Sequence, residues 1–223
     1  MTTISEKQSY GTSHFTKYLN RCIALLGIVL FLGIGSSSAQ YVAEDQQPPS
    51  DVVEKLHNTL MHIMQNSEDL GFEGRYKELA PVIHTYFDTP LIAKVILSRQ
   101  WSDLSEDDKA AFVDLYNQLI IATYASRFTD YDDEQFLTLS IQQLSKGRVL
   151  VKSELQRPND KTVKLDYLMT QNGDDWMIIS VIANGANDLA IKRGEYADVI
   201  KMKSYAGLIT EIQRKIHGME KEI

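Results

Sequence analysis

The sequence predicts an α+β fold, in which helices come first, a four-stranded antiparallel sheet follows, and two further helices pack back onto it. Apolar residues recur at three- and four-residue spacing between Ser50 and Phe128, which is the period of amphipathic helices. After Asp130 the period changes to two, which is the period of strands. With 223 residues and 43% hydrophobic content, the chain is expected to build one main core.

Helices are predicted throughout the first half. Ser50 is a good N-cap for an amphipathic helix that continues to about Gln65. A short helix is expected over residues 72–79, followed by another turn or two as far as Phe87. Thr89 and Pro90 form an N-cap and first-position pair, which predicts a helix that ends near Ser98.

The stretch from Trp101 to Phe128 predicts a long helix with an unusually wide apolar arc. Ser105 is its expected N-cap, and the acidic residues 106–108 suit the positive end of the helix dipole. Apolar residues lie on more than one side of this helix. It therefore needs either a sheet and other helices around it, or a sheet and a bound apolar ligand.

Strands are predicted over residues 135–144, 148–156, 163–169 and 176–183. Asn172 and Gly173 are typical of a tight hairpin turn between the last two. A helix is then expected over residues 188–197, and a final helix from Ser204 is expected to fray into a charged tail from Arg214.

The N-terminal residues have the pattern of an export signal. Lys17 and Arg21 precede an apolar run over residues 22–34, and small residues up to Ala39 form a cleavage site. Residues 1–39 are thus predicted to be a signal peptide, and residues 40–49 a linker. An uncleaved membrane anchor is the alternative, although the apolar run is shorter than the ~20 residues that span a bilayer comfortably.

Charge and composition exclude several functions. Loss of residues 1–39 would remove Lys7, Lys17, Arg21 and Glu6, leaving 20 basic and 29 acidic residues, a net charge of −9. Nucleic acid is therefore not an expected partner. The only cysteine, Cys22, lies in the predicted signal, so disulfides and thiolate catalysis are not expected in the exported chain.

Catalytic and metal-binding motifs are not found in the sequence. It contains no G-x-S-x-G, H-E-x-x-H, Walker or G-x-G-x-x-G pattern. His57 and His62 are five residues apart, so they lie about 140° apart on a helix and are expected to be solvated rather than to share a metal. The acidic residues 130–134 lack the spacing of a calcium loop. No cofactor, metal or enzymatic activity is predicted.

The candidate site is a set of apolar and aromatic residues between the helical half and the sheet. Each would be a core residue if taken alone, but together they could line a pocket for an acyl chain. The candidates are Trp101, Phe112, Tyr116, Leu119, Tyr124, Phe128, Val149, Val151, Leu165, Tyr167 and Ile178. Tyr124 and Phe128, which lie late in the helix and off its main stripe, are expected to form the pocket wall.

The order of several residues resembles the MlaC or toluene-tolerance family of periplasmic phospholipid shuttles. The similarity extends over about residues 50–215, which would be the lipid-binding domain, with a charged tail over residues 216–223. Residues 70–75 and 190–196 are more similar to the hopanoid-associated branch of the family. The residues that carry the resemblance are Phe87, Asp88, the run from Trp101 to Ser105, Phe112, the run from Thr123 to Phe128, Trp176, Gly185, Leu189, Ala190, Arg193 and Tyr196.

This resemblance implies an NTF2-like sheet, a deep apolar pocket for lipid tails, and a headgroup near the pocket mouth. It also implies an inner-membrane transport complex and an outer-membrane acceptor as partners. Lys192 and Arg193 are the candidates for contact with a headgroup or docking partner. The chain has Ala186 after Gly185, where the family usually has a small hydroxyl residue. A hopanoid therefore competes with a phospholipid as the expected ligand.

Three hypotheses about function follow. The leading one is periplasmic carriage of a lipid between membrane complexes, without catalysis. A ketosteroid-isomerase-like enzyme would need a carboxylate or histidine in the cavity with a raised pKa. A structural adaptor of a membrane complex would need no cavity.

Overall fold

The structure is a computed structural model that describes residues 47–221. The predicted signal peptide, residues 1–39, and most of the predicted linker, residues 40–49, lie outside the described residues. Within the described part of the chain, no helix combines the length and the hydropathy needed to cross a membrane.

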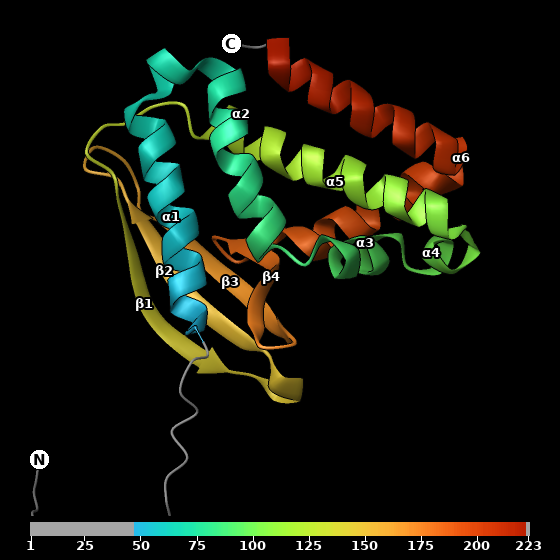
Figure 1. Ribbon diagram of the computed structural model, residues 1–223, viewed down its shortest axis with the longest axis horizontal. Helices are drawn as coiled ribbons and strands as arrows, with labels where there is room; N and C mark the ends of the chain where they lie inside the picture. The colour runs from blue at the N-terminus through green and yellow to red at the C-terminus, as the bar shows by residue number, and fades with distance from the viewer. Residues whose placement is uncertain (1–46, 222–223) are drawn as a thin grey trace, which may run out of the picture. The chain divides into compact units, whose positions relative to one another are not determined.

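Helices and strands follow the predicted order, which confirms the α+β class (Figure 1). The helices are α1 (Pro49–Gln65), α2 (Ser67–Tyr86), α3 (Thr89–Leu97), α4 (Arg99–Asp103), α5 (Glu106–Arg127) and α6 (Asp188–Lys221). The strands are β1 (Gln135–Gln143), β2 (Val149–Gln156), β3 (Val163–Asn172), β4 (Asp175–Ala183) and β5 (Ala186–Asn187), with one short 3-10 turn, η1 (Ser145–Gly147).

The sheet has five strands in the order β1-β2-β3-β4-β5, and all neighbours are antiparallel. The prediction of four strands was therefore wrong by one short strand. Asn184 and Gly185 both have positive φ, 49° and 85°, so the chain reverses at once after β4 and pairs Ala186 with Ala183. Asn184 also accepts a hydrogen bond from the backbone nitrogen of Lys164 at 3.0 Å, which ties this turn to β3.

The second helix is longer than expected. A single element, α2, replaces the short helix predicted over residues 72–79 and its extra turns, with a kink at Gly71, where φ is 55°. Arg75 is almost completely buried. Its guanidinium donates to the backbone oxygens of Ala125 and Ser67, both at 2.9 Å, and so joins α2 to α5.

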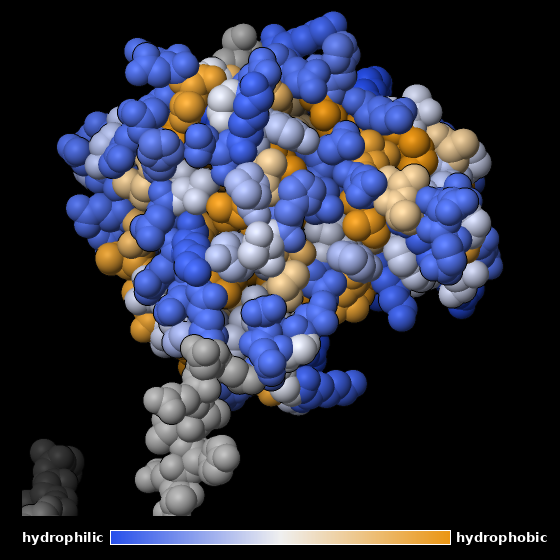
Figure 2. All heavy atoms as spheres, viewed as in Figure 1, coloured by the Kyte–Doolittle hydropathy of each residue, from blue (hydrophilic) through white to orange (hydrophobic). Residues whose placement is uncertain are grey.

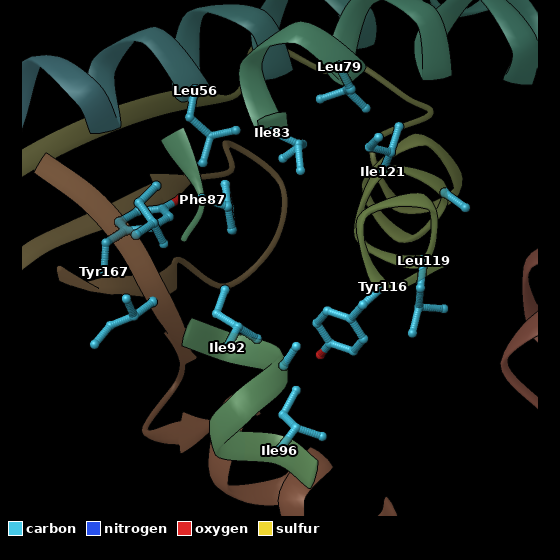
Figure 3. Packing of buried hydrophobic residues seen from close by; sticks show 14 of the residues in the cluster. Leu56, Leu79, Ile83, Phe87, Ile92, Ile96, Tyr116, Leu119, Ile121 and Tyr167 are labelled. Carbon is cyan, nitrogen blue, oxygen red and sulfur yellow. The ribbon is translucent and has the colours of Figure 1, made fainter. Parts of the chain in front are cut away.

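Helix α5 begins as predicted, with Ser105 as its N-cap, because the Ser105 hydroxyl accepts a hydrogen bond from Asp108 N at 3.1 Å. Its wide apolar arc is covered by several neighbours. Leu79 of α2 faces Ile121 of α5 in the core (Figure 3), and both are fully buried. Trp101 does not belong to this helix, because it lies in the separate short helix α4.

Helix α6 consists of two arms that meet at Ser204, where φ is 70°. Tyr196 of the first arm packs against Tyr116 of α5, with ring centroids 6.3 Å apart. In the second arm Tyr205 packs against Phe112, and Met219 accepts a hydrogen bond from Ser126. The first arm therefore runs antiparallel to α5, and the second arm runs parallel to it. Figure 1 shows the second arm beside α5.

The predicted charged tail is part of the folded domain. The second arm of α6 continues to Lys221 rather than fraying from Arg214. Ile216 is buried against the core and Met219 packs on it. These two apolar residues continue the stripe of the final helix, which explains why the charged residues around them do not end it.

A buried polar contact joins α3 to α5. The Thr89 hydroxyl donates to the side-chain oxygen of Asn117 at 2.6 Å, and both residues are buried. The same α3 is fixed to the sheet because Asp88 N donates to Ile178 O at 3.0 Å. These contacts hold α3, α5 and β4 at a defined distance from one another.

Replacement of Thr89 by valine should leave the buried amide of Asn117 without this donor. We expect the free energy of unfolding to fall by about 1–3 kcal/mol, measured by urea denaturation. The control is Thr59→Val on α1, where the hydroxyl bonds only to Lys55 O of its own helix on an exposed surface. Equal effects of the two substitutions would contradict the assigned role of Thr89.

Candidate functional site

A mostly apolar cavity lies between the sheet and α3, α5 and α6, and its volume is about 340 Å³. We call it the sheet–helix pocket. It is more enclosed than the surface grooves described below, and carbon-rich side chains form most of its wall. Such a cavity suits an apolar ligand with a polar end.

One stripe of α5 forms the first wall. Its members are spaced three or four residues apart, which places them on one face of the helix. Tyr116 points from this face toward Ile92 and Ile96 of α3 (Figure 3). The stripe consists of Tyr116, Leu119, Ile120, Thr123, Tyr124, Arg127 and Phe128.

One face of β3 and β4 forms the opposite wall. Leu165 pairs with Ala183, and Tyr167 pairs with Val181, and all four side chains line the pocket. The register then shifts between Leu168 and Met169, because β4 holds the extra residue Ile179. Beyond this β-bulge, Ile178 pairs with Met169, and both are completely buried in the core instead.

Aromatic rings form a continuous row along the pocket wall and into the core. Tyr124 stacks on Phe128, with centroids 5.7 Å apart and planes 9° apart, and also contacts Phe87 edge-on at 6.1 Å. Phe128 contacts Phe136 of β1 at 6.3 Å. Phe136 in turn stacks on His57 of α1 at 4.2 Å. The inner end of the row is therefore a titratable ring.

His57 is buried, which corrects the expectation that it is solvated. Its Nε2 lies 3.0 Å from the Tyr167 hydroxyl, and only 4% of the residue is exposed. Burial lowers the pKa of His57 from 6.5 to about 4, and burial also raises the pKa of Tyr167 well above its usual value. Both groups are therefore neutral near pH 7, so Tyr167, which lines the pocket, is hydrogen-bonded to an uncharged partner in the core behind it.

Charged groups lie on the helical side of the pocket. Asp188, at the start of α6, accepts hydrogen bonds from the Ser180 hydroxyl at 2.8 Å and from Val181 N at 3.0 Å. Burial raises the pKa of Asp188, and these hydrogen bonds act in the opposite direction. Lys192, Lys215 and Arg127 complete the charged part of the lining.

Several predicted site residues come together in the pocket and others do not. Tyr116, Leu119, Tyr124, Phe128, Leu165, Tyr167 and Lys192 line it. Val149, Val151 and Ile178 are fully buried in the core. Phe112 lines a groove between α5 and α6, and Trp101 lies on α4. Arg193 is exposed, with Nη2 3.5 Å from the Ser98 hydroxyl.

Sequence reasoning missed 13 of the 20 residues that line the pocket. Ile120, Thr123 and Arg127 share the spacing of Tyr116 and Leu119, so the α5 stripe itself could have indicated them. Ile179 and Val181 depend on the bulge in β4, which no local pattern predicts. Lys215 depends on the reversal of α6 at Ser204.

Several surface grooves are larger than the sheet–helix pocket but more open, and two of them have the greatest volumes. One, of about 710 Å³, is lined mainly by polar residues around α2 and the end of α5. The other, of about 520 Å³, lies between α5 and α6, where Figure 2 shows hydrophobic side chains among charged ones. Among residues 47–221, no group of three or more His, Cys, Asp or Glu side chains is placed to hold a metal ion.

Substitution of His57 by glutamine should flatten the dependence of stability on pH. The folded-state pKa of about 4 lies below the unfolded value of 6.5, so the unfolded chain binds more protons between these values, and stability decreases as the pH is lowered through this range. We expect wild-type protein to lose about 2 kcal/mol between pH 7 and pH 5 from this residue, and His57→Gln to lose correspondingly less.

Urea denaturation at the two pH values measures this difference. The exposed His84 provides the control, because His84→Gln should retain the wild-type dependence on pH. An unchanged pH dependence in His57→Gln would mean that His57 does not titrate as a buried group.

Comparison with known proteins gives a family and a fold. No curated protein matches the chain. Among solved structures, a phospholipid-binding protein from Ralstonia solanacearum, in complex with a phospholipid, superimposes with a TM-score of 0.69 at 17% identity, over 78% of this chain and 100% of that one. At this identity, the likeness shows that the two proteins share a fold.

The family model described as the MlaC protein matches residues 54–214, from α1 to the second arm of α6. This range contains every residue of the sheet–helix pocket except Lys215. It also covers well over half of the 223 residues. The chain therefore belongs to the MlaC family.

Proposed function

We propose that this protein is a lipid carrier that holds acyl chains in the sheet–helix pocket and transfers them between membrane complexes. The observation that carries the proposal is the pocket wall itself, in which the α5 stripe faces the apolar side of β3 and β4. Membership of the MlaC family and a fold shared with a phospholipid-binding protein support it.

Burial of acyl chains in this pocket would keep them out of water after they leave the bilayer, and so would compensate for the cost of extraction. Each Å² of apolar surface removed from water is worth about 25 cal/mol, which offsets the loss of contacts in the bilayer. The volume of about 340 Å³ lies near the lower limit of ligand pockets, roughly 300–1,000 Å³. The walls must therefore separate when a two-chain lipid enters, and a partner that favours the open state would promote exchange.

A phospholipid is the proposed ligand, because the protein from Ralstonia solanacearum was solved with one. A hopanoid is the competing ligand, since Ala186 stands where the family usually has a hydroxyl residue. In this structure Ala186 begins β5 and does not line the pocket. Its effect on ligand choice would have to be indirect.

The proposal extends to location and organisation. Residues 1–39 would direct export to the periplasm, residues 40–49 would link the leader to the domain, and an NTF2-like curvature of the sheet would shape the pocket. The partners would be an inner-membrane transport complex and an outer-membrane acceptor. Because α6 continues to Lys221, the proposed lipid-binding domain extends through the end of the described chain rather than stopping at residue 215.

The ketosteroid-isomerase-like alternative has one observation in its favour, the buried carboxyl of Asp188 in the pocket. However, this carboxyl accepts hydrogen bonds from both Ser180 and Val181, so it is occupied in holding the start of α6 against β4. Proton exchange at the α-carbon of a 3-keto steroid in D₂O tests the alternative. Exchange that is lost in Asp188→Asn would favour the enzyme.

The adaptor alternative fits the structure less well. An adaptor has no use for an enclosed apolar cavity, whereas residues of α3, α5, β3, β4 and α6 all line one here. A carrier needs this cavity, so its presence favours carriage over a purely structural role.

Introduction of a charge on the pocket wall should prevent lipid retention. Phe128 is half-buried and stacks on Tyr124, so Phe128→Glu would place a carboxylate against the acyl chains. We expect at least about tenfold less bound lipid per protein than in the wild type. Native mass spectrometry and lipid extraction from purified protein measure the amount.

A control and a second variant separate this effect from unfolding. Leu139→Glu introduces the same carboxylate on β1, at a residue that is 57% exposed and outside the pocket, and should retain lipid. Thr123→Trp should fill the cavity without adding charge and also reduce the lipid content. Wild-type protein that is consistently free of lipid would contradict the proposed function.

A further inference from the structure

Three basic side chains from separate parts of the chain meet at the sheet–helix pocket. Arg127 ends α5, Lys192 lies in the first arm of α6, and Lys215 lies in the second arm. The chain reverses at Ser204, so Lys192 and Lys215 line the same pocket and repel each other although they are 23 positions apart in the sequence. The formal net charge of the whole chain is −7, so this grouping opposes the general charge of the protein.

Acidic side chains compensate this grouping only in part. Lys192 forms an ion pair with Glu195 and lies over the ring of Tyr196, with Nζ 6.0 Å from the centroid. Asp188 already accepts hydrogen bonds from Ser180 and Val181. Within residues 47–221, the side chains of Arg127 and Lys215 form no ion pair or hydrogen bond.

Lys215 is exposed on one side, but its surroundings within the protein disfavour its charge. Partial burial lowers the pKa of Lys215, repulsion from Lys192 and Arg127 lowers it further, and Glu195 acts in the opposite direction. Arg127 has a structural reason for its position, because a cation in the last turn of α5 interacts favourably with the helix dipole. No such reason applies to Lys215, which lies inside a helix and beside two other cations.

We propose that Arg127, Lys192 and Lys215 form a binding site for the negatively charged headgroup of the carried lipid. This inference rests on the proposed carrier function and specifies its substrate class. A net-negative headgroup contributes an acidic oxygen without an ammonium group to offset it, so it satisfies Arg127 and Lys215 better than a zwitterionic headgroup does. The apolar walls would accept the acyl chains of either class, and the three cations would make the carrier prefer anionic lipids.

A competition between two headgroups tests the inference. Purified protein stripped of lipid is equilibrated with vesicles of equal phosphatidylglycerol and phosphatidylethanolamine that have identical acyl chains. Mass spectrometry of the protein-bound lipid then gives the ratio of the two, and the total amount of lipid is measured separately. We expect the wild type to be enriched in phosphatidylglycerol by about threefold to tenfold, and the enrichment to shrink as sodium chloride is raised.

Charge-matched variants show whether these residues cause the enrichment. Arg127→Gln/Lys215→Gln should bring the ratio close to that of the vesicles. Arg99→Gln/Lys201→Gln removes the same two charges from exposed positions outside the pocket and should retain the enrichment. Lys215→Arg keeps the charge and should also retain it, which excludes a general effect of substitution at this position.

The possible outcomes distinguish failure of the headgroup site from failure of the proposed carrier function. If wild-type protein binds lipid in the ratio of the vesicles, or if Arg127→Gln/Lys215→Gln keeps the enrichment, only the headgroup site is overturned. If wild-type protein binds neither lipid, the carrier function fails as well. Inorganic phosphate at matched ionic strength should have no additional effect, and loss of the enrichment at low-millimolar phosphate would mean a site for free anions and overturn the proposal.

Discussion

The surroundings of α5 determine most of this structure. Its apolar arc is wider than one neighbour can cover, so α2 packs on one side and the two arms of α6 pack on others. The remaining stripe, which includes Tyr124 and Phe128, faces β3 and β4 across the sheet–helix pocket. The pocket thus exists because helices cover most of α5 while the sheet approaches the last part without filling the space between them.

The sequence was sufficient for the order of the elements and for the α5 wall. Helical spacing depends only on nearby residues, so the N-cap at Ser105 and the positions of Tyr116 and Phe128 could be predicted locally. The burial of His57 could not be predicted from nearby residues, because it depends on Phe136 and Tyr167, which approach His57 from β1 and β3. The fifth strand likewise depends on the reversal of the chain at Asn184, and the position of Lys215 in the pocket depends on the reversal at Ser204.

Polar groups in and near the pocket lie in two regions, one uncharged and one positively charged. At the inner end, His57 and Tyr167 satisfy each other and remain uncharged near pH 7, so they impose little penalty on a neighbouring apolar chain. On the outer side, Lys215 and Arg127 retain exposed charge. An amphipathic ligand would meet apolar walls between these regions, which defines a single orientation with its charged end toward the cations.

The bulge at Ile179 divides β4 into two parts, of which one packs in the core and the other lines the pocket. The part before it ends at Ile178, which is bridged to Phe87 and buried in the core, whereas Ser180, Val181 and Ala183 after it line the cavity. One strand therefore contributes to folding through one segment and to ligand contact through the other. Changes at Val181 or Ala183 can alter the ligands that fit while the anchoring of α3 at Ile178 stays intact, so a single scaffold of this kind can be adapted to lipids of different shape.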